Sequence, residues 1–192
     1  MDDYLSLFSM PKPMKITGRS SSITNAFINA IIPVVNPSAE EVQQALNKLG
    51  MTPENFQCAY CGSAVSEWDH FRPLVHQQKP TGYISEIHNL VPSCGKCNQS
   101  KGNKEWKEWI TSDAKLSPKT RGIKDLAQRI ERLEAYEQWG APTKIHFEAI
   151  VGQETWQNHW QNWEKIQVLM REAQKLAEKI KQQVASEYQK SS

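Results

Sequence analysis

The chain has 192 residues, with 23 Lys and Arg against 21 Asp and Glu, so its formal net charge is +2. This length suits one compact domain with appendages or two small domains, and the near balance of charge confines any nucleic-acid-binding face to one part of the surface. The acidic start differs from a signal peptide, and no apolar run approaches the roughly 18 residues of a membrane span. We therefore expect a soluble, cytoplasmic protein with no membrane partner.

Residues 1–54 are expected to form an N-terminal helical region. The first 20 residues mix proline, glycine and serine with scattered apolar residues, and we predict no regular structure for them. Residues 22–32 carry apolar side chains at intervals of three and four, which predicts a short helix. A second helix is predicted over 38–49, because Ser38 and the glutamate three residues later have the spacing of a capping box.

Residues 55–112 change to short β-type runs followed by a helical pattern. The spacing predicts a hairpin over 56–74, with its second strand at 65–68. Residues 87–92 are expected to be extended, and a helix is predicted over 96–110. This alternation of short strands and helices favours an α+β fold class for the chain.

Residues 113–192 form the expected C-terminal helical region. An amphipathic segment lies at 123–133, and residues 154–186 contain neither proline nor glycine, which predicts one long helix. From Trp163 to Val184 apolar residues follow the alternating three-and-four spacing of a coiled-coil seam or an antiparallel helix pair. This stripe predicts a homodimer, with packing against the same chain as the alternative.

Four cysteines form two C-x-x-C pairs, Cys58 with Cys61 and Cys94 with Cys97, separated by 32 residues. Two such pairs are typical of a tetrahedral zinc site with four thiolate ligands. Because all four ligands would come from the protein, this zinc is expected to be structural rather than catalytic. Two disulfides or four unlinked thiols are the alternatives.

An Asp69-His70 pair lies between the two cysteine pairs, Asn89 precedes the second pair, and Asn98 follows its last cysteine directly. Taken singly, an Asp-His pair is more often a surface or core feature than a catalytic one. In this order, however, residues 56–110 resemble the zinc-containing, four-cysteine subtype of the HNH endonucleases. The resemblance implies a central ββα-metal motif flanked by the N-terminal helices and the long C-terminal helix.

The resemblance also implies a role for each residue of the motif. His70 would be the general base that activates the attacking water. Asp69 and Asn98 would bind a catalytic Mg²⁺ or Mn²⁺, which both prefer oxygen ligands. Asn89 would brace the loop that carries the base without taking part in the chemistry. Asn98 stands where the fullest form of the motif has a second histidine, which leaves the metal preference open.

The region 94–124 holds eight basic against three acidic side chains and is the expected nucleic-acid face. Arg72, two residues after the base, is a further candidate to hold a phosphate. Trp106 and Trp109 are expected in the core rather than stacked on bases. The lysines expected to line one helix face towards the phosphate backbone are Lys101, Lys104 and Lys107.

Together these patterns predict a metal-dependent endonuclease that acts on DNA, with double-stranded DNA as the expected substrate. The size and the flanking helices suggest a small type II restriction endonuclease or another phage-defence enzyme. One alternative is a homing or nicking enzyme of the same family. Another is a zinc-knuckle module that binds nucleic acid without hydrolysing it.

Overall fold

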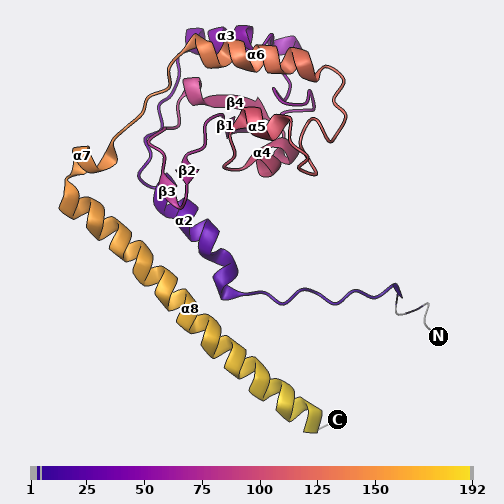
Figure 1. Ribbon diagram of the computed structural model, residues 1–192, viewed down its shortest axis with the longest axis vertical. Helices are drawn as coiled ribbons and strands as arrows, with labels where there is room; N and C mark the ends of the chain where they lie inside the picture. Colours follow the sequence, from indigo (N-terminus) through magenta and orange to yellow (C-terminus); the bar gives the residue numbers. More distant parts are fainter. Residues whose placement is uncertain (1–3, 5, 191–192) are drawn as a thin grey trace. The chain divides into compact units, whose positions relative to one another are not determined.

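The computed structural model describes Tyr4 and residues 6–190, and the chain divides into two compact units (Figure 1). The central unit comprises residues 28–150, and the terminal unit combines the N-terminal segment up to Phe27 with the chain from Val151 onward. This division differs from the three sequence regions, because helices on both sides of residues 55–112 contribute to one core. Within the described residues, every helix is too short or too polar to cross a membrane.

The central unit is built on strands β1 (Glu67–His70) and β4 (Leu90–Ser93), which pair antiparallel with Glu67 opposite Ser93 and His70 opposite Leu90. Helix α4 (Gly95–Lys101) follows β4 after a single residue. Two strands and a helix in this order, beside a cluster of four cysteines, confirm the predicted α+β class with a central ββα motif.

The predicted hairpin over 56–74 is wrong, because β1 pairs with β4 and not with the segment that precedes it. That segment instead forms a tight turn in which the Cys58 amide donates to the Ser63 carbonyl and the Gly62 amide donates to the Cys58 carbonyl. These turn bonds use the backbone groups that a strand ladder would need.

A second, two-stranded sheet follows β1, with β2 (Val75–His76) paired to β3 (Lys79–Pro80). The two turn residues, Gln77 and Gln78, have φ values of +47° and +64°, as a two-residue hairpin turn of the primed type requires. The short helix η3 (Ile87–Asn89) then leads into β4. The sequence predicted that all of residues 87–92 would be extended, so this prediction is wrong for the first three of them.

The single helix predicted over 96–110 is in fact two helices, α4 and α5 (Trp106–Ile110). Gly102 ends α4 with a φ of +50°, a conformation that L-residues with side chains seldom adopt. Because of this break, Lys101, Lys104 and Lys107 do not share one helix face.

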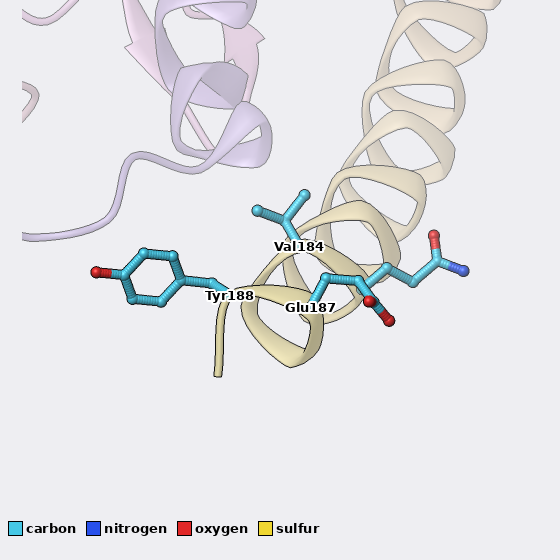
Figure 2. Close-up of a pocket in the computed structure, with 4 residues that line it drawn as sticks. Val184, Glu187 and Tyr188 are labelled. Carbon is cyan, nitrogen blue, oxygen red and sulfur yellow. The ribbon is translucent and has the colours of Figure 1, made fainter. Parts of the chain in front are cut away.

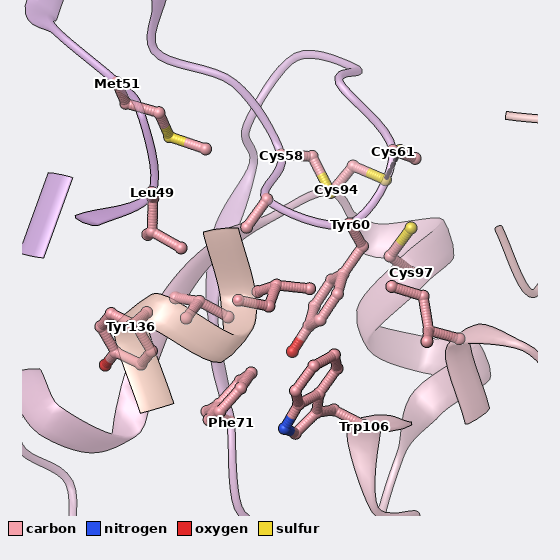
Figure 3. Packing of buried hydrophobic residues seen from close by; sticks show 14 of the residues in the cluster. Leu49, Met51, Cys58, Tyr60, Cys61, Phe71, Cys94, Cys97, Trp106 and Tyr136 are labelled. Carbon is pink, nitrogen blue, oxygen red and sulfur yellow. Dashed lines mark hydrogen bonds between the residues drawn. The ribbon is translucent and has the colours of Figure 1, made fainter. Parts of the chain in front are cut away.

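Helices α3 (Ala39–Lys48) and α6 (Leu126–Trp139) close the core of the central unit. The short helices η2 (Pro53–Asn55) and α7 (Phe147–Val151) bury none of their residues. The predicted capping box of α3 is present. Inside the core, Phe71 stacks on Trp106 at 5.0 Å and meets Tyr136 edge-on at 5.3 Å (Figure 3). Trp106 and Trp109 are both buried, as predicted.

The terminal unit contains η1 (Ile16–Arg19), α2 (Ser20–Asn29, which continues into the central unit) and the long helix α8 (Gln153–Lys190). The absence of regular structure predicted for residues 1–20 is therefore wrong at Tyr4 and Ser6, which are helical, and from Ile16 onward. Two hydrogen bonds hold α8 to this segment: Trp163 Nε1 donates to Thr24 Oγ1 at 3.0 Å, and the Ile16 amide donates to Gln174 Oε1 at 2.7 Å. The helix predicted over 154–186 is confirmed.

Candidate zinc knuckle and nuclease site

The four cysteines converge on one point of the central unit (Figure 3). Their sulfur atoms all lie within 4.8 Å of one another, and Cys61 Sγ is 3.6 Å from Cys94 Sγ. Zn–S bonds of about 2.3 Å in a tetrahedron place the sulfurs about 3.8 Å apart. All four cysteines are free and buried, so they fit a structural zinc ion.

The surroundings of the sulfurs suit a charged metal–thiolate group. Arg121 Nη1 donates to Cys97 Sγ at 3.3 Å, which places a positive charge beside ligands whose total charge exceeds that of Zn²⁺. The Ser63 hydroxyl is 3.3 Å from Cys61 Sγ. The sequence places Arg121 in the basic region 94–124 but does not connect it to Cys97, because no spacing rule links residues 24 positions apart.

His70 is the last residue of β1, and its Nε2 lies 2.8 Å from the Ser85 hydroxyl. Burial, and secondarily the positive charge of Lys101, lower the pKa of His70 to about 4. The imidazole is therefore neutral near pH 7 and able to accept a proton. Sequence reasoning missed Ser85, which lies in a segment without a motif.

Asp69 points into the protein, where it is almost fully buried. The hydroxyl of Tyr60, which Figure 3 shows, donates a hydrogen bond to Asp69 Oδ2 at 2.6 Å. Lys101 Nζ lies 3.1 Å from the same oxygen. Burial raises the pKa of Asp69, while the charge of Lys101 opposes this shift. The carboxylate is thus held by two partners from the interior.

Lys101 is completely buried, in contrast to the expected role on a phosphate-facing surface. Its ammonium group also donates to the His70 carbonyl at 2.7 Å. In this position Lys101 links α4 to β1 and neutralises Asp69, and its charge is not presented to a nucleic acid. The expected phosphate contact therefore does not fit this placement of Lys101.

Asn98 lies in α4 and is partly exposed, as is Glu67 at the start of β1. Asn98 Nδ2 donates to Glu67 Oε2 at 2.6 Å, which leaves the amide oxygen of Asn98 outside this bond. Glu67 was not among the expected site residues. Its position two residues before Asp69 on a strand could have identified it, because residues at i and i+2 share a face.

Asn89 is completely buried and holds the chain that follows His70. Its Oδ1 accepts from the Arg72 amide at 2.8 Å, and its Nδ2 donates to the carbonyls of Arg72 and Ile84, each at 3.2 Å. Both ends of the loop between β1 and η3 are therefore fixed to one side chain.

Of the remaining basic candidates, Arg72 and Lys107 lie beside an acidic side chain, whereas Lys104 contacts backbone carbonyls. Arg72 Nη2 is 3.6 Å from Glu137 Oε1, and Lys107 Nζ is 3.1 Å from the other oxygen of the same carboxylate. Lys104 is exposed, and its ammonium donates to the Ser100 carbonyl at 2.9 Å.

The geometry of the central unit is that of a ββα motif with a cysteine zinc knuckle. Residues 58–104 match the HNH endonuclease family. The CRISPR-associated endonuclease Cas9 of Corynebacterium diphtheriae is 37% identical to this chain over 86 residues, which are 36% of this chain and 8% of that relative. The chain spans less than a tenth of the curated relative that it matches. No solved structure matches the chain.

The chain therefore carries an HNH endonuclease domain, and its cysteine cluster agrees with the zinc-containing subtype.

Proposed function

We propose that this protein is a divalent-metal-dependent DNA endonuclease in which His70 is the general base. The observation that carries the proposal is the family match over 58–104. The sequence resemblance assigns the three motif positions within this range to His70, Asn89 and Asn98. Double-stranded DNA is the proposed substrate, and restriction or another form of phage defence is the proposed biological role.

His70 would take the proton of the attacking water at Nε2. Its low pKa keeps the imidazole neutral, and the Ser85 hydroxyl orients the ring. A water that gives its proton to Nε2 takes the place of this hydroxyl or passes the proton through it. Asn89 supports this step indirectly, because it fixes the backbone directly after the base.

The proposed Mg²⁺ or Mn²⁺ would neutralise charge on the scissile phosphate. Asn98 fits as a ligand, because its side chain is partly exposed and its amide oxygen is not used in the bond to Glu67. Asp69 does not fit in this conformation, because an ammonium group lies 3.1 Å from its carboxylate and a hydroxyl already donates to it. In this conformation, therefore, Asp69 contributes no ligand to a cation.

Digestion of long duplex DNA by the zinc-loaded protein, with Mg²⁺ or Mn²⁺ added, tests the proposal. We expect cleavage by the wild type and a loss of about 10²- to 10⁴-fold in His70→Ala, with DNA affinity and zinc content retained. Discrete fragments would indicate site-specific cleavage, and a smear a general nuclease. Near-normal cleavage by His70→Ala would refute the role of His70.

A nucleic-acid-binding zinc module without hydrolytic activity is the second candidate. The buried pairing of Asp69 with Lys101 favours it, because this pairing removes one expected metal ligand from solvent. Intact DNA in the presence of every divalent metal, together with a measurable DNA affinity, would support this candidate over the nuclease.

A further inference from the structure

Glu137 connects two basic side chains that sequence analysis assigned to nucleic-acid binding. It lies on α6, outside the residues that match the HNH family. One carboxylate oxygen is 3.6 Å from Arg72 Nη2 and accepts from Trp106 Nε1 at 3.3 Å, while the other is 3.1 Å from Lys107 Nζ. The hydrogen bond to Glu137 is the main cause of a raised pKa at Lys107.

The guanidinium group of Arg72 is held in place but has an unused donor. Its Cζ lies 5.7 Å from the ring centre of Phe71 and 5.9 Å from that of Tyr83, within range of cation–π contacts. Among the described residues, the buried Nη1 atom has no hydrogen-bond partner. A buried guanidinium nitrogen without a partner is costly, so a small shift of the side chain that brings Nη1 into contact with a phosphate would be favourable.

The position of Arg72 ties this donor to the nuclease site. Arg72 follows His70 by two residues, and Asn89 binds its backbone on both sides through Oδ1 and Nδ2. The backbone of Arg72 is therefore fixed by Asn89 and its side chain by Glu137.

We propose that Glu137 is a positioning residue that holds Arg72 and Lys107 together, so that the two side chains form one grip, a binding site for the phosphate backbone of the nucleic acid. This inference rests on the proposed function. It adds that the grip is completed by α6, so that the family-matched segment alone would bind DNA less well than the whole chain.

Because Glu137 is negatively charged, general electrostatics and the proposal predict opposite changes in DNA affinity when it is replaced by glutamine. Replacing Glu137 with glutamine removes a negative charge near a polyanion, so general electrostatics predicts tighter DNA binding. The proposal predicts the opposite, because Arg72 and Lys107 lose the group that orients them. Glutamine keeps an acceptor for Trp106 Nε1.

DNA affinity is measured by fluorescence anisotropy on the zinc-loaded full chain, in a His70→Ala background that prevents cleavage. We expect Glu137→Gln to weaken binding on the order of tenfold, as misplaced binding groups do. The matched control is Glu134→Gln, one turn earlier on α6, whose carboxylate contacts Lys107 at 3.4 Å and is not paired with Arg72. This control is expected to bind equally or more tightly.

A double-mutant cycle separates positioning from a general loss of structure. In an Arg72→Ala background, Glu137→Gln is expected to lose most of its effect on DNA affinity, whereas a merely destabilising substitution would weaken binding to the same extent in both backgrounds.

If Glu137→Gln fails to retain zinc, Arg72→Lys tests the same contact from the side of the arginine. It keeps the charge but lacks the planar fork, so it is also expected to weaken binding.

Equal or tighter binding by a folded Glu137→Gln protein, or unchanged binding by a folded Arg72→Lys protein, would overturn the inference. These outcomes leave the proposed nuclease function intact if the wild type cleaves DNA. A wild type that neither binds nor cleaves DNA would instead refute the proposed function itself.

Discussion

The central and terminal units differ in which side chains they bury. The central unit encloses charged and polar groups with partners, among them Asp69 with Lys101, and Asn89 with the backbone around it. The terminal unit leaves large apolar side chains of α8 exposed, including Leu169 at 64% and Leu176 at 60%.

The two units therefore suit different tasks. The central unit holds the candidate catalytic groups, and the terminal unit offers a surface for association. A buried network of hydrogen-bonded polar groups holds these groups in fixed positions, as a catalytic site requires. An exposed apolar stripe on a long helix is typical of an association surface. Near the C-terminal end of α8 the stripe continues in a shallow groove lined by Val184, Glu187 and Tyr188 (Figure 2).

Removing zinc is expected to have the largest effect, and only on the central unit. Replacing Cys97 with serine removes one ligand, and because metal-binding energy in such sites is folding energy, the central unit is expected to unfold. Helix α8 has its own contacts to Thr24 and Ile16 and is expected to remain helical. Near-ultraviolet circular dichroism reports the loss of core packing, and the far-ultraviolet helical signal that remains after this loss reports α8.

Elemental analysis of the wild type, purified without added metal, is expected to find about one zinc per chain. A protein that contains no zinc and carries its cysteines as disulfides would contradict both the zinc site and the cytoplasmic location expected from the sequence. A native-like near-ultraviolet spectrum for Cys97→Ser would contradict the dependence of the fold on the metal.

Breaking the buried ion pair is expected to have the second-largest effect. Lys101→Ala leaves the Asp69 carboxylate buried without its cation, which costs about 3–5 kcal/mol of unfolding free energy. The control is Lys104→Ala, because Lys104 is exposed and its ammonium donates to the carbonyls of Ser100 and Lys101. Urea unfolding at constant zinc compares the two variants. Equal stabilities would show that Lys101 has no structural role.

Local rules predicted some of these features from the sequence and missed others. The zinc ligands follow from the spacing within each C-x-x-C pair, and the start of α3 follows from the capping box at Ser38, because each of these motifs spans only four residues. The pairing of β1 with β4 was missed, since it joins strands 20 residues apart whose short lengths carry little pattern.

The burial of Lys101 could not be predicted, because lysine is almost never fully buried unless it is paired. Its partner, Asp69, precedes it by 32 positions, and the sequence assigned both residues to other roles. The link between Arg72 and Glu137 was missed for the same reason, because it depends on how α6 packs against the core rather than on any spacing in the chain.

On the terminal unit, the exposed stripe of α8 sharpens the prediction of a homodimer. We expect light scattering to give twice the monomer mass of 22.0 kDa, and Leu169→Glu with Leu176→Glu to restore the monomer without changing the zinc content. Gln182→Glu is the control, because position 182 lies on the opposite side of the helix. A wild-type mass of one chain, with and without DNA, would exclude the dimer and favour nicking over double-strand cleavage.

The smallest expected effect is a pH dependence of stability that comes from His70 in the central unit. Burial lowers the folded-state pKa of His70 to about 4, below its ordinary value of 6.5, so protons bind the unfolded chain more readily. The contribution of His70 to stability is therefore fully present above pH 6.5 and is lost as pH falls from there towards 4. Between about pH 7 and about pH 5.5 this loss amounts to about 1 kcal/mol. Urea unfolding of the zinc-loaded wild type and of His70→Asn at both pH values isolates this contribution, because other groups titrate equally in the two proteins. We expect the stability of the wild type to fall more steeply than that of the variant. Parallel slopes would mean that His70 titrates near its ordinary pKa, and that the imidazole is more open to water than its contact with Ser85 indicates.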